Sequence, residues 1–426
     1  MSKTQPAVIA LFPEASFGAA LNCVGIAQEL KRLGTKPVFF THPGFDGVFS
    51  EYGFDEYGIA VANESSLEET QNYWQGFLNR HLPHFKLSPQ QQIDSYVAPV
   101  WEAIVESTID VETGLEALIE EIKPALIVID NVIMFPAIER ASCPWVRVIS
   151  CAETELSDAF IPPYLSGISS DDVDAFDAFH RHYLQALDPI HRRYNDFRES
   201  RGLAALPAGE FLETSPWLNL ILAPQIIRRR REKTLDQDRF KFLEACVRHE
   251  GPFEVPVLPN NSGPLVYVSF GSLGAMDTRL FQRMISVFAD FPARFLLNVG
   301  GLIDCYTEVP DNVYLEEWYP QPSVVEQCDL FIHHGGNNSF CEALYYGIPS
   351  LIMPYCWDGH DNATRAQECK VGRHMNRDDW SKEQFTGLIG DMLKDKQMRS
   401  RLRSNSEFMR RQPGPIAAAE HILTLL

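Results

Sequence analysis

The sequence FIHHGGNNSFCEALYYGIP, residues 331–349, has the pattern from which the fold class follows most directly. Its first residues complete an apolar run typical of a buried strand, two glycines then turn the chain, and a helix is expected from Asn338 or Ser339. Glycine backbone can approach an anion closely, a helix N-terminus carries partial positive charge, and His334 can donate a hydrogen bond from the strand end. A strand, a glycine turn and a helix in this order predict a parallel α/β domain with an anion site at the turn.

Helix capping offers a second explanation for part of this stretch. Ser339 and Glu342 have the spacing of a capping box, while Gly347 and Pro349 are typical of a helix end. Glycine-rich turns between a strand and a helix are also common and weakly specific. The stretch by itself therefore leaves both an anion site and simple capping open.

The same alternation of short apolar strands and helices extends in both directions along the chain. Helices are expected from about residue 19 to 33 and from 101 to 122, and Gly34 would close the first of them. Alternation of this kind predicts parallel sheets covered by helices on both faces. The expected strands are residues 7–11, 37–40, 125–129, 145–149 and 218–222 in the first half, and 265–270, 294–299, 313–315, 330–333 and 350–353 in the second.

The length of 426 residues exceeds what one hydrophobic core usually supports, so two domains with a cleft between them are expected. We predict a first domain over residues 1–225 with a helical insertion at about 152–215, and a linker over 226–262, where the composition becomes charged and then rich in Pro and Asn. The second domain is predicted over 263–405, followed by a C-terminal helix, 406–426, that packs back toward the first domain.

Composition and charge limit the classes of partner. Hydrophobic residues make up 45% and charged residues 22%, as in an ordinary folded protein, so we expect most of the chain to be ordered. The formal net charge of -20 disfavours nucleic acid, since Arg228 to Arg231 is the one basic cluster in the sequence. Nine cysteines without a Cys-x-x-Cys pair, no signal-like start and no long apolar run predict a cytoplasmic protein without a transmembrane anchor.

One segment resembles a known family. In order and spacing, residues 318–363 are similar to the donor-binding signature of the UDP-dependent glycosyltransferases, often called family 1. That resemblance implies a GT-B fold, in which two Rossmann-like domains with parallel sheets face each other across a cleft. The matching residues are Trp318-Tyr-Pro-Gln321, His334-Gly-Gly-Asn-Asn-Ser339, Glu342, Gly347-Ile-Pro349, Asp358 and Asn362-Ala363, and Ser269-Phe-Gly-Ser272 resembles the first loop of the family's second domain.

The resemblance also implies a role for each matching residue. Trp318 would stack on the nucleobase with Gln321 nearby, and Glu342 would accept hydrogen bonds from ribose hydroxyls. Asp358 would bind hydroxyls of the donor sugar. The diphosphate would be held without a metal or other cofactor by His334, by Asn338 and Ser339 at the turn formed with Gly336, and by Ser272 from the other loop.

Two positions depart from the family pattern. The family commonly has Asp-Gln at the sugar contact, whereas this chain has Asp358-Gly359 followed by His360, so the identity of the sugar stays open and His360 is a candidate replacement. The family's catalytic His after the first strand aligns with Ala19, or with Phe17 when the alignment is counted from the strand. Neither residue can take a proton.

A base must therefore come from another residue if this chain transfers sugar. Asp130, at the end of a buried strand, matches the carboxylate that usually partners the catalytic His, and Glu14 follows the first strand. A carboxylate can act directly as a base when burial raises its pKa. The candidates for the base are Glu14, His42, His81, His84 and Asp130, and we assign the catalytic role to Asp130 and Glu14. Two alternatives remain: the acceptor is acidic enough to lose its proton with little help from a base, or the chain is catalytically silent.

We therefore expect an inverting, metal-independent glycosyltransferase that moves a hexosyl group from a nucleoside diphosphate sugar, with UDP the expected nucleotide, to a small lipophilic acceptor. A non-catalytic nucleotide-sugar-binding relative and a nucleotide-sugar epimerase on the same fold are the alternatives. Two Asp-x-Asp motifs, at residues 172–174 and 236–238, are interpreted as charged surface rather than metal sites. No phosphate loop of the ATPase type, dinucleotide fingerprint or esterase elbow is present in the sequence.

Overall fold

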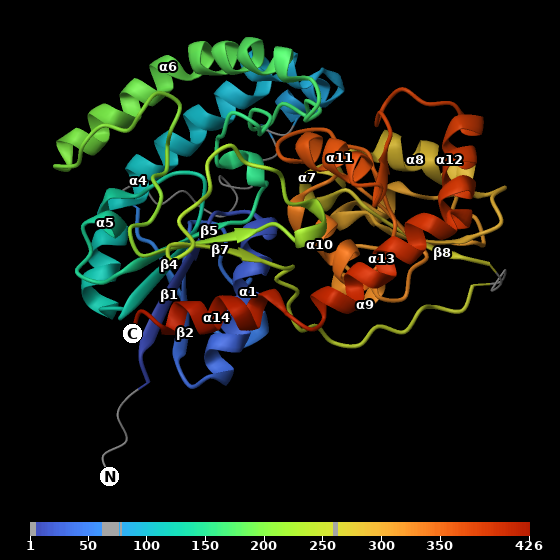
Figure 1. Cartoon of the computed structure of the whole chain (residues 1–426). Helices are drawn as coiled ribbons and strands as arrows, with labels where there is room; N and C mark the ends of the chain where they lie inside the picture. Colours follow the sequence, from blue (N-terminus) through green and yellow to red (C-terminus); the bar gives the residue numbers. More distant parts are fainter. Residues whose placement is uncertain (1–5, 62–75, 77–78, 259–262) are drawn as a thin grey trace.

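The computed structural model describes the whole chain except residues 1–5, 62–75, 77–78 and 259–262. Its described part contains two parallel sheets, the first formed by strands between residues 8 and 243 and the second by strands between residues 265 and 374 (Figure 1). The first sheet has the order β3-β2-β1-β4-β5-β6-β7, and every neighbouring pair is parallel. Its strands are β1 (Val8–Pro13), β2 (Lys36–Thr41), β3 (Asp55–Gly58), β4 (Leu126–Asp130), β5 (Trp145–Ile149), β6 (Leu218–Leu222) and β7 (Phe240–Leu243).

The second sheet has six strands in the order β10-β9-β8-β11-β12-β13, again all parallel. With the first sheet it confirms the predicted fold class of two Rossmann-like domains. Its strands are β8 (Leu265–Ser269), β9 (Arg294–Asn298), β10 (Val313–Glu316), β11 (Leu330–His333), β12 (Ser350–Ile352) and β13 (Gly372–His374).

The central strands form where the sequence has continuous apolar runs. All five residues of β4, β5, β6 and β8 are buried, as expected for strands covered by helices on both faces. The sequence reading missed β3, β7 and β13, which all lie at sheet edges and have few buried side chains. β7 lies inside the predicted linker, so the first sheet extends further along the chain than the sequence indicated.

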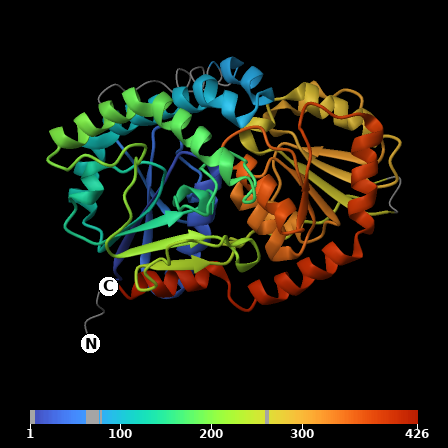
Figure 2. The ribbon, with the colours of Figure 1, turned by 45° about the horizontal axis from the view of Figure 1, so that its top comes forward.

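Helices cover both faces of each sheet (Figures 1 and 2). In the first half they are α1 (Phe17–Arg32), α3 (Pro89–Gln92), α4 (Ala98–Ile122), α5 (Pro136–Glu139) and α6 (Phe176–Ser200). The predicted helical insertion contains α6, and the chain from residue 150 to α6 has no other regular structure than two short 3-10 helices, Glu153–Glu155 and Val173–Ala175. In the second half the helices are α7 (Gly271–Gly274), α8 (Thr278–Phe288), α9 (Gln321–Val325), α10 (Asn337–Tyr346), α11 (Gly359–Glu368), α12 (Lys382–Lys394), α13 (Lys396–Met409) and α14 (Gly414–Leu423).

The C-terminal segment returns from the second domain to the first, as its red ribbon shows in Figure 2. In α14, Ala418, Ala419 and Ile422 are fully buried in the apolar cluster that also contains residues of α1. The first residue of α14, Gly414, lies directly against the backbone after β7: a Cβ atom at this position would lie 2.2 Å from the carbonyl oxygen of Glu244. The exact domain boundaries stay a prediction.

The order of the strands places a crevice at the carboxyl edge of each sheet. In the first sheet β1 lies between β2 and β4, and in the second β8 lies between β9 and β11, so the connections leave in opposite directions at these points. Ligands of open parallel sheets bind outside the carboxyl ends of the strands at such switch points. The two edges face each other, because the Nδ2 atom of Asn337 donates hydrogen bonds to the carbonyl oxygens of Ser150, at 2.9 Å, and Leu222, at 3.0 Å.

Candidate active site

The turn between β11 and α10 has a backbone that an anion can approach closely. α10 begins at Asn337, one residue earlier than expected, and its N-cap residue, Gly336, has no side chain with which to cap the helix. The capping box proposed for Ser339 and Glu342 is therefore not formed, and simple capping does not explain why these residues are present. The backbone N–H of Asn337 donates to Asp358, and the N–H groups that follow it in the first turn remain available to an anion at this helix end.

His334 lies between two glycine segments at this turn. A Cβ atom at Gly336 would lie 2.5 Å from His334 Nε2, and one at Gly271 would lie 3.0 Å from Cε1, so larger residues would displace the imidazole ring. The ring stacks on Tyr355 with 5.4 Å between the centroids. Burial lowers the pKa of His334 to about 4, so the ring is neutral at physiological pH, and its buried Nδ1 atom has no hydrogen-bond partner among the described residues. Ser272 is exposed in α7, directly after β8 and beside this turn.

The residues expected to bind the nucleoside are also brought together. Gln321 Nε2 donates hydrogen bonds to Ser339 Oγ at 3.1 Å and to Glu342 Oε2 at 2.7 Å, and Asn338 Nδ2 donates to Glu342 Oε1 at 3.3 Å. Trp318 precedes α9, and its residue is 51% exposed, so a face of the indole is free to stack on a planar ring.

The partner of Glu342 is one that sequence reasoning missed. Arg248 Nη1 donates to Glu342 Oε1 at 2.9 Å, and both side chains are 1% exposed. Arg248 also contacts Glu250 at 2.5 Å and the Tyr52 hydroxyl at 3.3 Å. Because Arg248 lies in the predicted linker, 94 residues before Glu342, no local motif pointed to this pair.

Asp358 and His360 lie at the start of α11, the expected sugar end of the site. Asp358 Oδ2 accepts hydrogen bonds from the backbone N–H of Asn337 at 2.9 Å and from Asn362 Nδ2 at 3.2 Å. Burial, with repulsion from Asp361 and Glu14, raises the pKa of Asp358 to about 7. The half-buried His360 has a pKa lowered to about 4, first by burial, and its Nε2 atom has no hydrogen-bond partner among the described residues.

The structure gives a packing reason for Gly359, where the family commonly has Gln. A Cβ atom at Gly359 would lie 2.5 Å from the carbonyl oxygen of His334, and one at Gly335 would lie 2.7 Å from the carbonyl oxygen of Gly359. The two backbones therefore touch, and α11 lies too close to the turn after β11 for a side chain at either position. The missing Gln is a consequence of this close contact.

Gly359→Gln is therefore expected to destabilise the protein rather than restore a family-type sugar contact. A side chain at this position displaces backbone, and overpacking of this kind costs about 1–3 kcal/mol. The free energy of unfolding from urea titration measures the effect. The control Gly387→Gln, at an exposed position of α12 with nothing within 4 Å, should be neutral or stabilising; equal stability of the two variants would contradict the contact.

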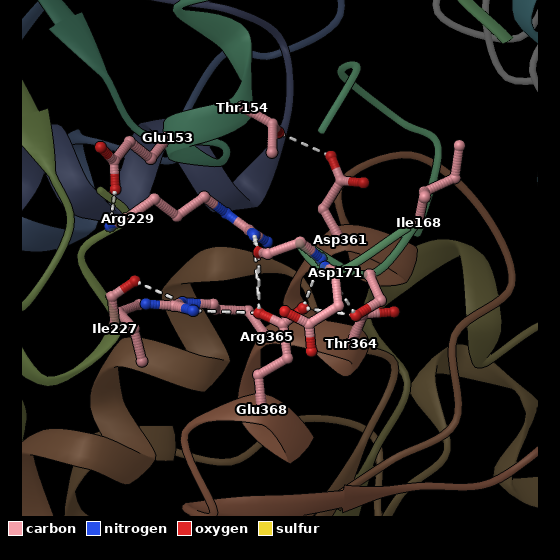
Figure 3. Close-up of polar contacts among 12 residues, drawn as sticks. Glu153, Thr154, Ile168, Asp171, Ile227, Arg229, Asp361, Thr364, Arg365 and Glu368 are labelled. Carbon is pink, nitrogen blue, oxygen red and sulfur yellow. Dashed lines mark hydrogen bonds and ion pairs between the residues drawn. The ribbon is translucent and has the colours of Figure 1, made fainter. Parts of the chain in front are cut away.

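One face of α11 is tied to the first domain by polar contacts (Figure 3). Asp361 accepts hydrogen bonds from the Thr154 hydroxyl at 2.6 Å and from the backbone N–H groups of Leu165 at 2.9 Å and Gly167 at 2.7 Å. Further along the helix, Arg365 Nε donates to the carbonyl oxygen of Ile227 at 2.8 Å. The helix that starts at the sugar end of the site is thus positioned by the first domain.

The carboxylate candidates for the base lie together at the facing edge of the first sheet. Glu14 follows β1 and Asp130 ends the neighbouring β4, and the Glu14 N–H donates to the carbonyl oxygen of Asp130 at 2.8 Å. Burial raises the pKa of both groups, and repulsion between Glu14, Asp130 and Glu155 raises the pKa of Asp130 further, although a hydrogen bond from Ser150 opposes the shift. Ser16 donates to Glu14 at 2.6 Å.

The two alignments of the missing His differ in where they place it. Phe17 lies at the cleft, 5.5 Å between ring centroids from Trp318. Ala19 is 4% exposed and stands one helical turn before Cys23, whose Sγ atom lies 3.8 Å from Asp130 Oδ2. Residues four apart share a helix face, so position 19, not position 17, faces the Asp130 carboxylate.

The histidine candidates lie in other surroundings. His42, directly after β2, stacks on Phe12 with 4.8 Å between centroids, and burial lowers its pKa to about 4. His81 and His84 contact each other, with 3.3 Å between their Nδ1 atoms.

The Asp-x-Asp motifs are at the surface, as interpreted. Asp172, Asp174, Asp236 and Asp238 are all exposed. In the described ranges no three His, Cys, Asp or Glu side chains are grouped in a way that could hold a metal ion.

Comparisons with known proteins agree with this geometry. Residues 298–425 match the family described as Erythromycin biosynthesis protein CIII-like, C-terminal domain. The chain is 22% identical to an NDP-glycosyltransferase of Bacillus subtilis (strain 168) over 75% of its length and 77% of that protein, and 24% identical to demethyllactenocin mycarosyltransferase of Streptomyces fradiae over 82% and 75%. Among solved structures, the glycosyltransferase of kitacinnamycin superposes with a TM-score of 0.71 at 19% identity, covering 99% of both chains.

The fold and the facing sheet edges thus define a GT-B protein. The sequence relatives and the matched C-terminal family support its place among the family 1 type glycosyltransferases of the microbial kind. Across the part of the chain that the structure describes, no helix is both long and apolar enough to cross a membrane.

Proposed function

We propose that this chain is an inverting glycosyltransferase that moves a hexosyl group from a nucleoside diphosphate sugar to a hydroxyl of a small lipophilic acceptor. The proposal rests on one observation: two candidate sites lie opposite each other, one at each of the facing sheet edges. The turn at His334 offers an anion site, and the Glu14 and Asp130 carboxylates lie on the other side of the cleft. Repulsion from Glu14 contributes to the raised pKa of Asp358, which supports a short separation between the two halves.

The donor half would use the residues that the sequence indicated. Trp318 would stack on the nucleobase, with Gln321 beside it at the nucleoside end. His334, Ser272 and the α10 turn at Gly336, Asn338 and Ser339 would hold the diphosphate, while Asp358 and His360 would lie at the sugar. The partial positive charge of the α10 N-terminus and neutral donors such as His334 would stabilise the leaving diphosphate without a metal.

The transfer reaction would use both the donor site and the carboxylates that lie opposite it. The acceptor hydroxyl loses its proton to a carboxylate while its oxygen forms a bond to the anomeric carbon, and the bond from that carbon to the diphosphate oxygen breaks on the opposite side. Attack and departure on opposite sides invert the anomeric centre. Asp130 or Glu14 would take the proton, because each is a carboxylate whose raised pKa makes it a stronger base.

The acceptor is proposed to be small and lipophilic because an aromatic cluster lies near the ends of the strands in the first sheet, at the edge where the carboxylates also lie. Phe12 directly precedes the end of β1, Phe135 lies 4.9 Å from it between centroids, and His42 stacks on its face. The formal net charge of -20 disfavours a polyanionic acceptor. The cytoplasmic location stays a prediction.

A mass-spectrometric screen of nucleoside diphosphate sugars against a broad acceptor panel tests the proposal. We expect a glycosylated product whose anomeric configuration is opposite to that of the donor. Conversion of the donor into an epimer without an acceptor would favour an epimerase. Tight nucleotide binding with neither transfer nor slow donor hydrolysis would identify a non-catalytic binding protein.

The pH dependence of transfer should report a carboxylate base. The base must be ionised, so the rate is full above its pKa and falls as the pH drops through it. Because burial raises the pKa of Glu14 above its usual 4.5, and that of Asp130 as well, the acid limb of kcat/KM should have its midpoint above 4.5. A kcat/KM that stays constant down to about pH 4 would contradict a buried carboxylate base.

A further inference from the structure

Glu342 has little capacity left for a ligand. Its Oε1 atom accepts hydrogen bonds from Arg248 Nη1 at 2.9 Å and Asn338 Nδ2 at 3.3 Å, and its Oε2 atom accepts one from Gln321 Nε2 at 2.7 Å. A carboxylate offers about four lone-pair positions, so roughly one is free. The neighbouring 2′- and 3′-hydroxyls of a ribose would bring two donors to a side chain that is only 1% exposed.

Arg248 is fixed in this position. Its neighbour His249 exchanges two backbone hydrogen bonds with the Gln28 side chain of α1, at 2.8 and 3.1 Å. The backbone of Arg248 also lies against α1, since a Cβ atom at Gly25 would be 3.4 Å from the Arg248 nitrogen. The guanidinium bridges Glu342 and Glu250, so a ligand that displaced it would leave the buried Glu342 carboxylate and the partly buried Glu250 carboxylate without their cation.

We propose that Arg248 is a specificity-determining residue that withdraws Glu342 from ribose recognition. The donor site then gains nothing from a 2′-hydroxyl and takes 2′-deoxyribonucleoside diphosphate sugars as readily as ribonucleoside ones. Glu342 acts as a positioning residue that orients Gln321 and Asn338, in place of the ribose contact and the UDP preference expected from the sequence. This inference rests on the proposed binding of a nucleoside diphosphate.

Calorimetric titration of the wild-type protein with UDP and dUDP tests the proposal, because the two ligands differ only in the 2′-hydroxyl. We expect dissociation constants within about fivefold of each other, since a lost hydrogen bond to a buried carboxylate would cost about tenfold or more. Binding of UDP more than about fivefold tighter than dUDP would overturn the role given to Arg248 but leave the proposed function standing. If neither nucleotide binds, the proposed function fails and this inference fails with it.

Two variants separate the effect of Arg248 on nucleotide preference from the effect of losing any buried arginine. Arg248→Met frees the Glu342 carboxylate, so UDP should become preferred over dUDP by about tenfold. Arg198→Met is the matched control, because Arg198 is likewise buried between two glutamates, Glu139 and Glu213, in the first domain; its UDP to dUDP ratio should stay that of the wild type. An Arg248→Met protein that folds and shows the wild-type ratio would contradict the role given to Arg248.

Glu342→Gln keeps the test decisive if Arg248→Met does not fold. Because the carboxylate is not expected to contact the ribose, this variant should change the affinities for UDP and dUDP by the same factor. A selective loss of UDP affinity of about fivefold or more would show that Glu342 reads the 2′-hydroxyl and would overturn the proposal.

Discussion

Asp130→Asn is expected to lower kcat for transfer by about 10²- to 10⁴-fold while leaving nucleotide affinity close to that of the wild type. The substitution keeps the shape of a side chain that is 2% exposed and removes its ability to take a proton. Glu14→Gln should show which of the two carboxylates is the base, since the two lie at neighbouring strand ends. Single-turnover rates and calorimetric titration with UDP separate the chemical step from binding.

Glu112→Gln is the matched control for this experiment. Glu112 is also a fully buried carboxylate, and burial raises its pKa to about 7, but it lies in the middle of α4 rather than at the sheet edge. Its substitution should leave transfer at the wild-type rate. If neither Asp130→Asn nor Glu14→Gln slows transfer more than about tenfold, neither of these two carboxylates is the base.

His334→Ala is expected to weaken nucleoside diphosphate binding by about 10- to 150-fold. A hydrogen bond to a charged group contributes about 1.5–3 kcal/mol, and the loss of the ring also removes the stacking partner of Tyr355. Because the ring is neutral throughout this range, titration of His334 should add nothing to the pH dependence of UDP affinity between about pH 6 and pH 8, so the wild type and His334→Ala should show the same pH dependence there. Titration calorimetry with UDP measures both effects.

His191→Ala provides the comparison for His334→Ala. His191 is buried in α6 of the first domain, where its Nε2 atom contacts the carbonyl oxygen of Glu210 at 2.9 Å, away from the proposed donor site. Its substitution should change stability without changing nucleotide affinity. Equal losses of affinity in the two variants would mean that the effect of His334→Ala is one of general destabilisation.

Much of the fold could be predicted because burial leaves a local record in the sequence. The strands over 145–149, 218–222 and 330–333 were predicted with the bounds that β5, β6 and β11 have, since each is a continuous apolar run. β3, with the sequence DEYG, and β13, with GRH, have no such run, because edge strands are paired on one side and need few buried side chains.

The site was predictable where its residues follow one another along the chain. The turn around His334 combines a strand end, glycines and a helix start in one short stretch. Contacts between distant segments left no such record: Arg248 meets Glu342 only in the folded chain, and Asp361 binds a loop 196 residues away. The close backbone contact at Gly359 likewise depends on how α11 lies against the turn after β11.

The most direct test of the central claim is the crystal structure of the protein with a bound nucleoside diphosphate. We expect diphosphate oxygens within about 2.7–3.2 Å of a His334 ring nitrogen and of backbone N–H groups in the first turn of α10. We also expect the nucleobase on Trp318, and Arg248 still paired with Glu342. A nucleotide bound elsewhere, with the turn at residues 334–339 unoccupied, would contradict the account.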